Sequence, residues 1–189
     1  VDVYLTHRED ADMSLKERAE FARSVDADFL FSIHYNASAN HELFGSEVWV
    51  SSVSPYNSYG YQFGYEFLTD MRELGLFVRG IKTRLGNGGA DYYGIIRQSV
   101  ALDIPAVILE HCHVDEARDA VFCDSEEQLK NFGRMDATAV ARYFGLKSSV
   151  LGVDYSDYSL TAADPSSNME ITAVDTTEPE LCVIDYKNA

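Results

Sequence analysis

The sequence predicts an α/β fold, a mostly parallel sheet with helices on both faces. Two observations predict this class. Short apolar runs rich in aromatic and β-branched residues, such as residues 28–33 and 104–110, alternate with longer stretches whose apolar residues recur at helical spacing. The short runs are continuous, which is typical of strands buried on both faces. Strands that alternate with helices favour a sheet covered on both sides.

Three stretches predict long helices. Residues 14–25 open with Ser14 and Glu17, which are spaced as a capping box. Residues 59–74 carry apolar side chains at helical spacing, although Gly60 and Gly64 weaken the prediction. Residues 125–145 form the third amphipathic stretch, with a glycine at its end. The side chains expected to face the core are Leu15, Ala19, Ala22, Val25, Phe63, Phe67, Met71, Leu74, Leu129, Phe132, Val140 and Tyr143.

The remaining segments of the first 147 residues predict strands. Residues 1–6 alternate between polar and apolar, and residues 28–33, 46–52 and 104–110 are short and apolar. Segments 75–84 and 91–99 are expected to be short strands or extended loops.

The pattern changes after Lys147, so we expect two units, residues 1–147 and residues 148–189. The second is rich in acidic residues and lacks helical spacing. Its short alternating runs, residues 169–174 and 181–186, predict strands joined by turns. Two or three strands cannot bury a core alone, so this unit is interpreted as a linker and the start of a β-sandwich-like module. An acidic regulatory tail is the alternative.

Charge and hydropathy exclude some partners. A formal net charge of −16 disfavours binding to nucleic acid, because the phosphate backbone would be repelled. No apolar run approaches the roughly 20 residues that span a bilayer, and no targeting signal is visible at the start. The three cysteines lack a CxxC spacing, so neither a disulfide framework nor a structural zinc site is indicated.

His34 and Glu110 are the candidate functional pair, because each ends an apolar strand. In open α/β sheets, functional groups gather beyond the carboxyl ends of strands, so these two can share one crevice. An unpaired buried carboxylate costs several kcal/mol, so Glu110 needs a partner or exposure. A histidine and a glutamate within reach of each other suggest a metal ligand and a general base around a bound water. A structural role for His34 is the open alternative.

A family resemblance adds to this interpretation. Residues 6–38, 44–52, 79–84, 92–97 and 105–112 together resemble the zinc-dependent N-acetylmuramoyl-L-alanine amidases of the amidase-3 type. The most specific segment is Ser-Ile-His-Tyr-Asn-Ala at residues 32–37, supported by the loop with Thr6, Arg8 and Asp10 and by the Ser-Leu-x-x-Arg helix start at residues 14–18. The likeness runs from about Val3 to Leu146.

The resemblance implies a zinc hydrolase-like fold, with Zn²⁺ as cofactor, His34 as a zinc ligand and Glu110 as the catalytic glutamate. It implies a secreted bacterial enzyme of the cell wall that acts on peptidoglycan. The reaction would be hydrolysis of the amide between N-acetylmuramic acid and the L-alanine of the stem peptide. The family's other two zinc ligands match no residue here, which implies that the first strand and helix are missing and that the chain alone is inactive.

Other residues are weaker candidates. His111 and His113 flank Cys112 and could bind a metal locally, although a third ligand is lacking. His7 and His41 are expected in solvated loops. The basic side chains near the crevice could meet the carboxylates of a peptide stem or pair with the protein's own acids. They are Arg79, Lys82, Arg84 and Arg97.

Two further functions remain open. The main alternative is a non-catalytic wall-binding or structural protein on a degenerate amidase scaffold. A zinc carboxypeptidase-like enzyme is disfavoured by the segment at residues 32–37. Asn36 is expected to hold the loop after His34 by side-chain hydrogen bonds rather than to contact substrate.

Overall fold

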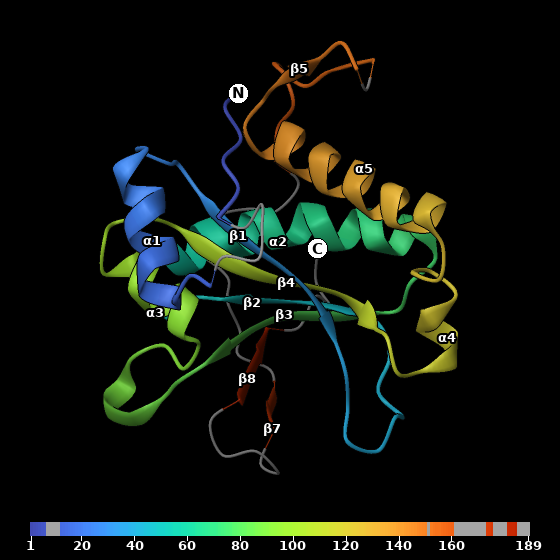
Figure 1. Cartoon of the computed structure of the whole chain (residues 1–189), viewed down its shortest axis with the longest axis horizontal. Helices are drawn as coiled ribbons and strands as arrows, with labels where there is room; N and C mark the ends of the chain where they lie inside the picture. Colours follow the sequence, from blue (N-terminus) through green and yellow to red (C-terminus); the bar gives the residue numbers. More distant parts are fainter. Residues whose placement is uncertain (7–11, 151, 161–172, 176–180, 185–189) are drawn as a thin grey trace.

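The computed structural model describes residues 1–6, 12–150, 152–160, 173–175 and 181–184, the last two segments without their side chains. Its main sheet has the strand order β1-β4-β2-β3-β8-β7 (Figure 1). The strands are β1 (Leu30–Asn36), β2 (Ser46–Val50), β3 (Val78–Arg84), β4 (Ala106–His113), β7 (Ala173–Asp175) and β8 (Leu181–Ile184). The pairs β1–β4 and β2–β3 are parallel, and β2–β4 is antiparallel. The predicted α/β class is therefore confirmed, with a mixed, mostly parallel arrangement of strands β1 to β4.

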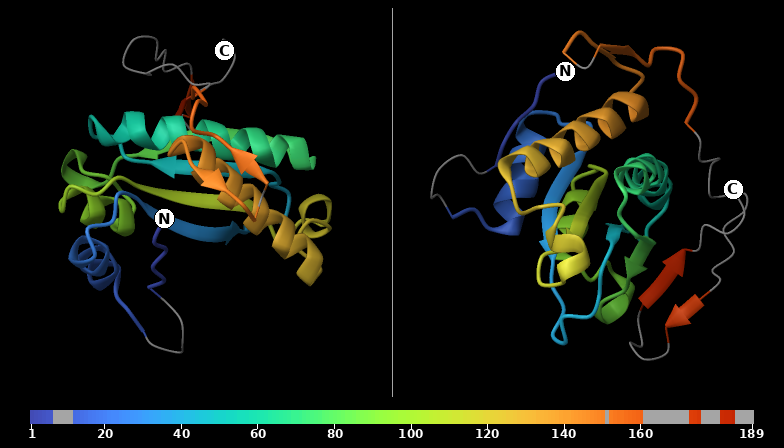
Figure 2. Two further views of the ribbon diagram at one scale, coloured as in Figure 1. Left: turned by 90° about the horizontal axis from the view of Figure 1, so that it is seen from above. Right: turned by 90° about the vertical axis from the view of Figure 1, so that its right-hand side faces the viewer.

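Helices cover both faces of the sheet. The longer ones are α1 (Leu15–Ser24), α2 (Tyr56–Leu74) and α5 (Glu126–Tyr143), and the shorter ones are α3 (Gly94–Val100), α4 (Ala117–Ala120) and the 3-10 turn η1 (Asn87–Gly89). Helices α2 and α5 pack on one face, whereas α1 and α3 lie together on the other (Figure 2). No helix in the described part of the chain is long and apolar enough to cross a membrane.

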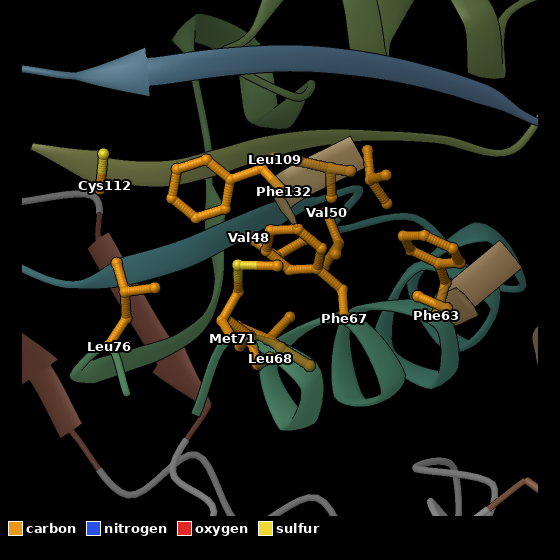
Figure 3. Packing of buried hydrophobic residues seen from close by; sticks show 13 residues of the cluster. Val48, Val50, Phe63, Phe67, Leu68, Met71, Leu76, Leu109, Cys112 and Phe132 are labelled. Atoms are coloured by element: carbon orange, nitrogen blue, oxygen red, sulfur yellow. The ribbon is translucent and has the colours of Figure 1, made fainter. Parts of the chain in front are cut away.

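The larger core lies between the sheet and α2 and α5. It includes Phe63, Phe67 and Met71 of α2, each fully buried (Figure 3). Gly60 and Gly64, which weakened the helix prediction, lie where α2 approaches the sheet most closely. A Cβ at Gly60 would come within 2.8 Å of Val50, so the helix can approach the sheet only with glycine at this position.

Several predicted elements are confirmed with their ends shifted. The capping box of Ser14 and Glu17 is present at the start of α1, and Gly145 follows α5 with a left-handed φ of 61°. The strands predicted at residues 28–33, 46–52 and 104–110 form as β1, β2 and β4. Leu15 and Leu129, which were expected in the core, are 49% and 45% exposed, because they lie on the outer sides of their helices.

Three local predictions are wrong. Residues 1–6 form no strand, and Val1 and Val3 are 87% and 72% exposed. Part of segment 91–99 is helix α3 rather than extended chain, because Ile95 and Ile96 turn together onto Trp49 and the neighbouring part of the sheet. Strand β1 is only half-buried or exposed along its length, because it lies at an edge of the sheet.

The segment after Lys147 forms short strands, and β7 and β8 among them join the main sheet. A short hairpin, β5 (Lys147–Ser148) and β6 (Val153–Asp154), follows α5 and is a separate two-stranded sheet. Strand β8 pairs antiparallel with β3 and with β7, so these two strands extend the main sheet at the edge opposite β1. The predicted run at residues 169–174 lies largely outside the described residues.

The contact between α2 and α5 carries a pH-sensitive group. Asp70 is 1% exposed, accepts a hydrogen bond from Arg142, and has one carboxylate oxygen without a partner among the described residues. Burial raises the pKa of Asp70 to about 6, although Arg142 opposes the shift; the neighbouring Glu73 and Glu66 add to it. The folded state therefore takes up this proton at a higher pH than the unfolded chain, whose aspartates titrate near pH 4.

We expect acidification from about pH 7 to about pH 4 to stabilise the wild-type chain relative to Asp70→Asn. The stabilisation is complete below the unfolded pKa and is lost as the pH rises through the folded pKa of about 6, because Asp70 must then be charged in the core. The difference in the free energy of unfolding should change by about 2 kcal/mol across this window, because one pKa unit corresponds to about 1.4 kcal/mol. Urea titrations of both proteins at several pH values measure it, and a constant difference would contradict the assignment.

Candidate functional site

Strands β1 and β4 bring His34 and Glu110 together. The two residues are direct partners in the parallel register, so their side chains lie side by side on one face of the sheet. Beyond this pair the register slips, and Asn36 pairs with His113. The bulge in β4 ends the regular pairing immediately after Glu110. Bulges of this kind commonly lie next to functional sites, where they redirect side chains.

Glu110 is half-buried, and its Oε2 atom has no hydrogen-bond partner among the described residues. The pKa of Glu110 is raised to about 7, chiefly by burial and also by the facing carboxylate of Glu47, while His111 acts to lower it. A buried carboxylate oxygen without a partner is costly in free energy, so its retention here favours a role toward a ligand or a reacting group. A carboxylate with a pKa near neutrality suits both uptake and release of a proton.

His34 lies on the outer strand of the sheet and is exposed. Its Nε2 atom is 2.9 Å from the hydroxyl of Ser32. Partial desolvation lowers the pKa of His34, and the positive charge of Arg18 lowers it further. Both effects favour the neutral imidazole, which is the form that binds metal ions.

Glu47 is a functional candidate that the sequence did not single out. It lies in the middle of β2, is 3% exposed, and is the antiparallel register partner of Glu110. Four side chains donate hydrogen bonds to its carboxylate: Asn36 and Trp49 to Oε1, and Arg79 and Lys82 to Oε2. Burial by itself would raise the pKa of Glu47, but Lys82 and Arg79 outweigh it and lower the pKa. The sequence signal was a glutamate inside a buried strand, which requires partners.

Asn36 links β1 to β2. Its Nδ2 donates to Glu47 over 3.1 Å, and its Oδ1 accepts from the backbone of Ala37 over 2.8 Å. Because β4 lies between β1 and β2, this side chain crosses the strand that carries Glu110. The expected structural role of Asn36 is therefore consistent with its contacts.

The basic residues expected near the crevice divide into two groups. Arg79 and Lys82 pair with Glu47 at the level of the site. Arg84 stacks on Tyr92, with its guanidinium carbon 3.9 Å from the ring centre, and Arg97 donates to backbone carbonyls of the same loop. The strand registers place Arg84 toward the opposite end of the sheet from Glu110. The four side chains therefore do not form one patch.

The two histidines beside Cys112 are buried and engaged separately. His111 is 2.8 Å from Asp136 through Nε2, and its Nδ1 is 3.2 Å from the carbonyl of His34. His113 Nδ1 is 3.2 Å from the carbonyl of Gly45. These contacts favour a structural role over a local metal site.

Of the two histidines expected in solvated loops, one lies among the described residues. His41 is exposed and forms an ion pair with Asp115 at 2.7 Å when protonated. His7, together with Arg8 and Asp10 of the loop that supports the resemblance, lies outside the described residues.

The described side chains around His34 and Glu110 are too few to hold a zinc ion. Structural and catalytic zinc sites in proteins use three or four side-chain ligands. Within residues 1–6, 12–150 and 152–160, no group of three or more His, Cys, Asp or Glu side chains is placed to hold a metal ion. His34 offers one neutral imidazole and Glu110 one free carboxylate oxygen, so the described residues do not by themselves fit a zinc ion.

A half-buried carboxylate beside an imidazole, at the ends of two neighbouring strands, is an arrangement that hydrolase sites use. The chain belongs to the N-acetylmuramoyl-L-alanine amidase family of the amidase-3 type, whose sequence model matches residues 1–142. A comparison with curated proteins found no match.

Solved structures support the fold. Cwp6 from Clostridium difficile is 27% identical with a TM-score of 0.68; the match covers 74% of this chain but only 22% of Cwp6. The catalytic domain of CwlV, an N-acetylmuramoyl-L-alanine amidase from Bacillus (Paenibacillus) polymyxa, is 26% identical with a TM-score of 0.63, and the match covers 77% of this chain and 74% of that domain. AmiC2 of Nostoc punctiforme, at 22% identity and a TM-score of 0.61, matches 75% of this chain and 71% of its own, and supports the fold alone.

Proposed function

We propose that the protein hydrolyses the amide bond between N-acetylmuramic acid and the L-alanine of the stem peptide in peptidoglycan. The observation that carries this proposal is the pairing of His34 with Glu110, whose Oε2 atom is buried without a partner among the described residues. Membership of the amidase family supports the reaction class and the substrate. The place of action would be the cell wall, outside the cytoplasm.

In the proposed reaction Glu110 is the general base. Its carboxylate accepts a proton from the water that attacks the lactyl carbonyl carbon. It then donates this proton to the amine nitrogen of L-alanine as the carbon–nitrogen bond breaks. Glu110 can serve both steps because it lies on the face of the sheet where the substrate amide would bind. Acid–base groups positioned in this way contribute about 10²- to 10⁴-fold to rates.

His34 is proposed as one imidazole ligand of a zinc ion, with Glu110 off the metal. The remaining ligands would come from groups other than the described residues, so no chemical step is assigned to the ion. Residues 148–189 are proposed as a separate unit from the catalytic residues 1–147, although β8 pairs with β3.

His34→Ala should lower the zinc content of the protein in the form its cell produces. The ligand would be lost without loss of the fold, because His34 is exposed on an edge strand. Elemental analysis after dialysis against a mild chelator measures the zinc bound per chain. His41→Ala is the matched control, since His41 is also exposed but lies in a loop. Equal zinc in wild type and His34→Ala would return His34 to a structural role beside Ser32.

A second candidate function is binding to the wall without catalysis. It is favoured by one observation, that the described residues hold no group of three metal-binding side chains. Retention of Glu110 argues against it, because binding alone does not need an unpaired buried carboxylate. Sedimentation with purified peptidoglycan, followed by analysis of the released peptides, distinguishes binding from cleavage.

A further inference from the structure

Two aromatic rings and an arginine form an exposed platform beside the candidate site. The ring centres of Phe44 and Phe77 are 5.2 Å apart, and the guanidinium carbon of Arg118 lies 3.5 Å from the centre of the Phe44 ring. Phe77 is 56% exposed, and Phe44 is half-buried. We call these three residues the aromatic platform. Adjacent exposed rings on a monomer commonly mark a binding surface.

The platform depends on the close approach of two chain segments. The backbone nitrogen of Ser46 donates to the carbonyl of Phe77 over 2.8 Å, and that of Gly45 donates to Asp119 over 2.6 Å. Gly45 has a φ of 101°, and a Cβ there would come within 2.9 Å of the Phe77 ring. Glycine therefore allows the segments that carry Phe44 and Phe77 to meet. The rings are held in place by the backbone, before any ligand binds.

Arg79 connects the platform to the candidate site. Its Nη1 donates to the carbonyl of Phe44 over 3.4 Å, and its Nε donates to Glu47 over 2.7 Å. Glu47 is in turn the register partner of Glu110. Phe77 lies two residues before Arg79, and the residue between them packs on the larger core. The platform and Glu110 therefore lie on the same face of the sheet, because alternate residues of an extended chain share a face.

We propose that the aromatic platform binds the N-acetylglucosamine ring next to the N-acetylmuramic acid whose amide is cut, with Phe77 as the main contact. The proposal rests on the proposed amidase function, which supplies the substrate. One face of a pyranose ring presents C–H groups, and packing this face on an aromatic ring removes apolar surface from water. Such a contact requires no charge on the ligand.

The charges around the platform favour a sugar over the stem peptide. Arg118 pairs through Nε with Glu116 at 2.9 Å, and its Nη2 donates to the carbonyl of Glu42 over 3.2 Å. Its guanidinium is therefore already engaged on two sides. The carboxylates of Glu42, Glu116 and Asp115 add negative charge to the neighbouring loops, which would repel the carboxylates of a stem peptide. A neutral sugar ring meets no such repulsion.

The test compares two soluble muropeptides that differ only in the N-acetylglucosamine ring. Both are assayed with the protein in the form its cell produces. We expect wild type to cleave the muropeptide that carries this ring about 5- to 10-fold better by kcat/KM, the scale of one aromatic contact. Phe77→Ala should lose this preference through a higher KM with kcat unchanged, and should keep kcat/KM for the other muropeptide within about twofold of wild type.

Two further variants serve as controls. Phe77→Trp restores a ring and should keep the preference. Tyr92→Ala is the matched control, because Tyr92 is 47% exposed and stacked by Arg84, but this pair lies at the opposite end of the sheet from Glu110. It should leave the preference unchanged. The same ratio of the two kcat/KM values in wild type and Phe77→Ala would overturn the proposal. An equal loss on both muropeptides would do so as well, because it would show a structural role for Phe77.

A binding measurement separates failure of this proposal from failure of the amidase function. Calorimetric titration with a peptide-free tetrasaccharide of alternating N-acetylglucosamine and N-acetylmuramic acid requires no cleavage. We expect Kd to be about 5- to 10-fold higher for Phe77→Ala and unchanged for Tyr92→Ala. If wild type cleaves neither muropeptide, the amidase function is wrong and the titration alone decides. Binding weakened by Phe77→Ala would then support the platform, and binding that is absent or unchanged would overturn it.

Discussion

Glu110→Gln should lower the rate of muropeptide hydrolysis by at least about 100-fold, the usual contribution of a general base. Glutamine keeps the shape of the side chain but cannot accept the proton of the attacking water. The zinc content should stay unchanged, because Glu110 is proposed to lie off the metal. The measurement is kcat/KM for a soluble muropeptide, with the protein in the form its cell produces and with metal analysis of the same samples.

Glu20→Gln is the control for removal of one carboxylate. Glu20 is exposed on α1 and forms a surface ion pair with Lys16, so its loss should leave kcat/KM within about twofold of wild type. Turnover by Glu110→Gln at the wild-type rate would remove Glu110 from the mechanism. A loss of zinc together with activity would instead make Glu110 a ligand.

The second large effect is on stability. Phe67→Ala should lower the free energy of unfolding by about 3–5 kcal/mol, the range for buried aromatic truncations. Phe67 is fully buried between α2 and the sheet, and its ring lies edge-on to His111 at 5.1 Å between ring centres. The loss is large compared with a total stability of about 5–15 kcal/mol. Equilibrium urea unfolding of the 189-residue chain measures it.

Leu129→Ala is the control for this experiment. The sequence pattern placed Leu129 in the core, but its side chain is 45% exposed on α5. Its truncation should cost less than about 1 kcal/mol. Equal losses for Phe67→Ala and Leu129→Ala would contradict the packing of α5 described here.

The sequence predicted those helices and strands whose stabilising contacts lie between residues close together along the chain. The Ser14–Glu17 capping box predicted the start of α1, because both hydrogen bonds lie within one helical turn. The continuous apolar run of β4 predicted a buried strand. Residues 1–6 alternate like a strand, but alternation gives a strand only where a neighbour pairs with it, and no strand of the described sheet pairs with this segment. The local pattern therefore showed that the segment could form a strand, but not whether another strand would pair with it.

The helix α3 shows a second limit. Tyr93 and Gly94 precede Ile95 and Ile96 in a segment that reads equally well as extended chain. The segment covers the part of the sheet around Trp49, whose ring centre is 4.9 Å from that of Tyr93. That contact depends on the order of the strands, which the sequence does not specify.

The site was partly predictable for the same reasons. His34 and Glu110 each end an apolar strand, so the topology argument placed them together, and the β1–β4 register agrees. Glu47 was not predictable as their neighbour, because its place depends on the antiparallel insertion of β2 beside β4. Its four donors come from three strands and are adjacent only in the folded sheet. The roles of His34 and Glu110 remain proposals.

The most direct test of the central claim is to identify the bond that is cut. The protein in the form its cell produces is incubated with N-acetylmuramoyl-L-alanyl peptides, and the products are identified by mass spectrometry. We expect a free peptide that begins with L-alanine and a muramic acid with a free lactyl carboxylate, both formed at least about 100-fold more slowly with Glu110→Gln. Cleavage at another bond, or binding to peptidoglycan without cleavage, would contradict it.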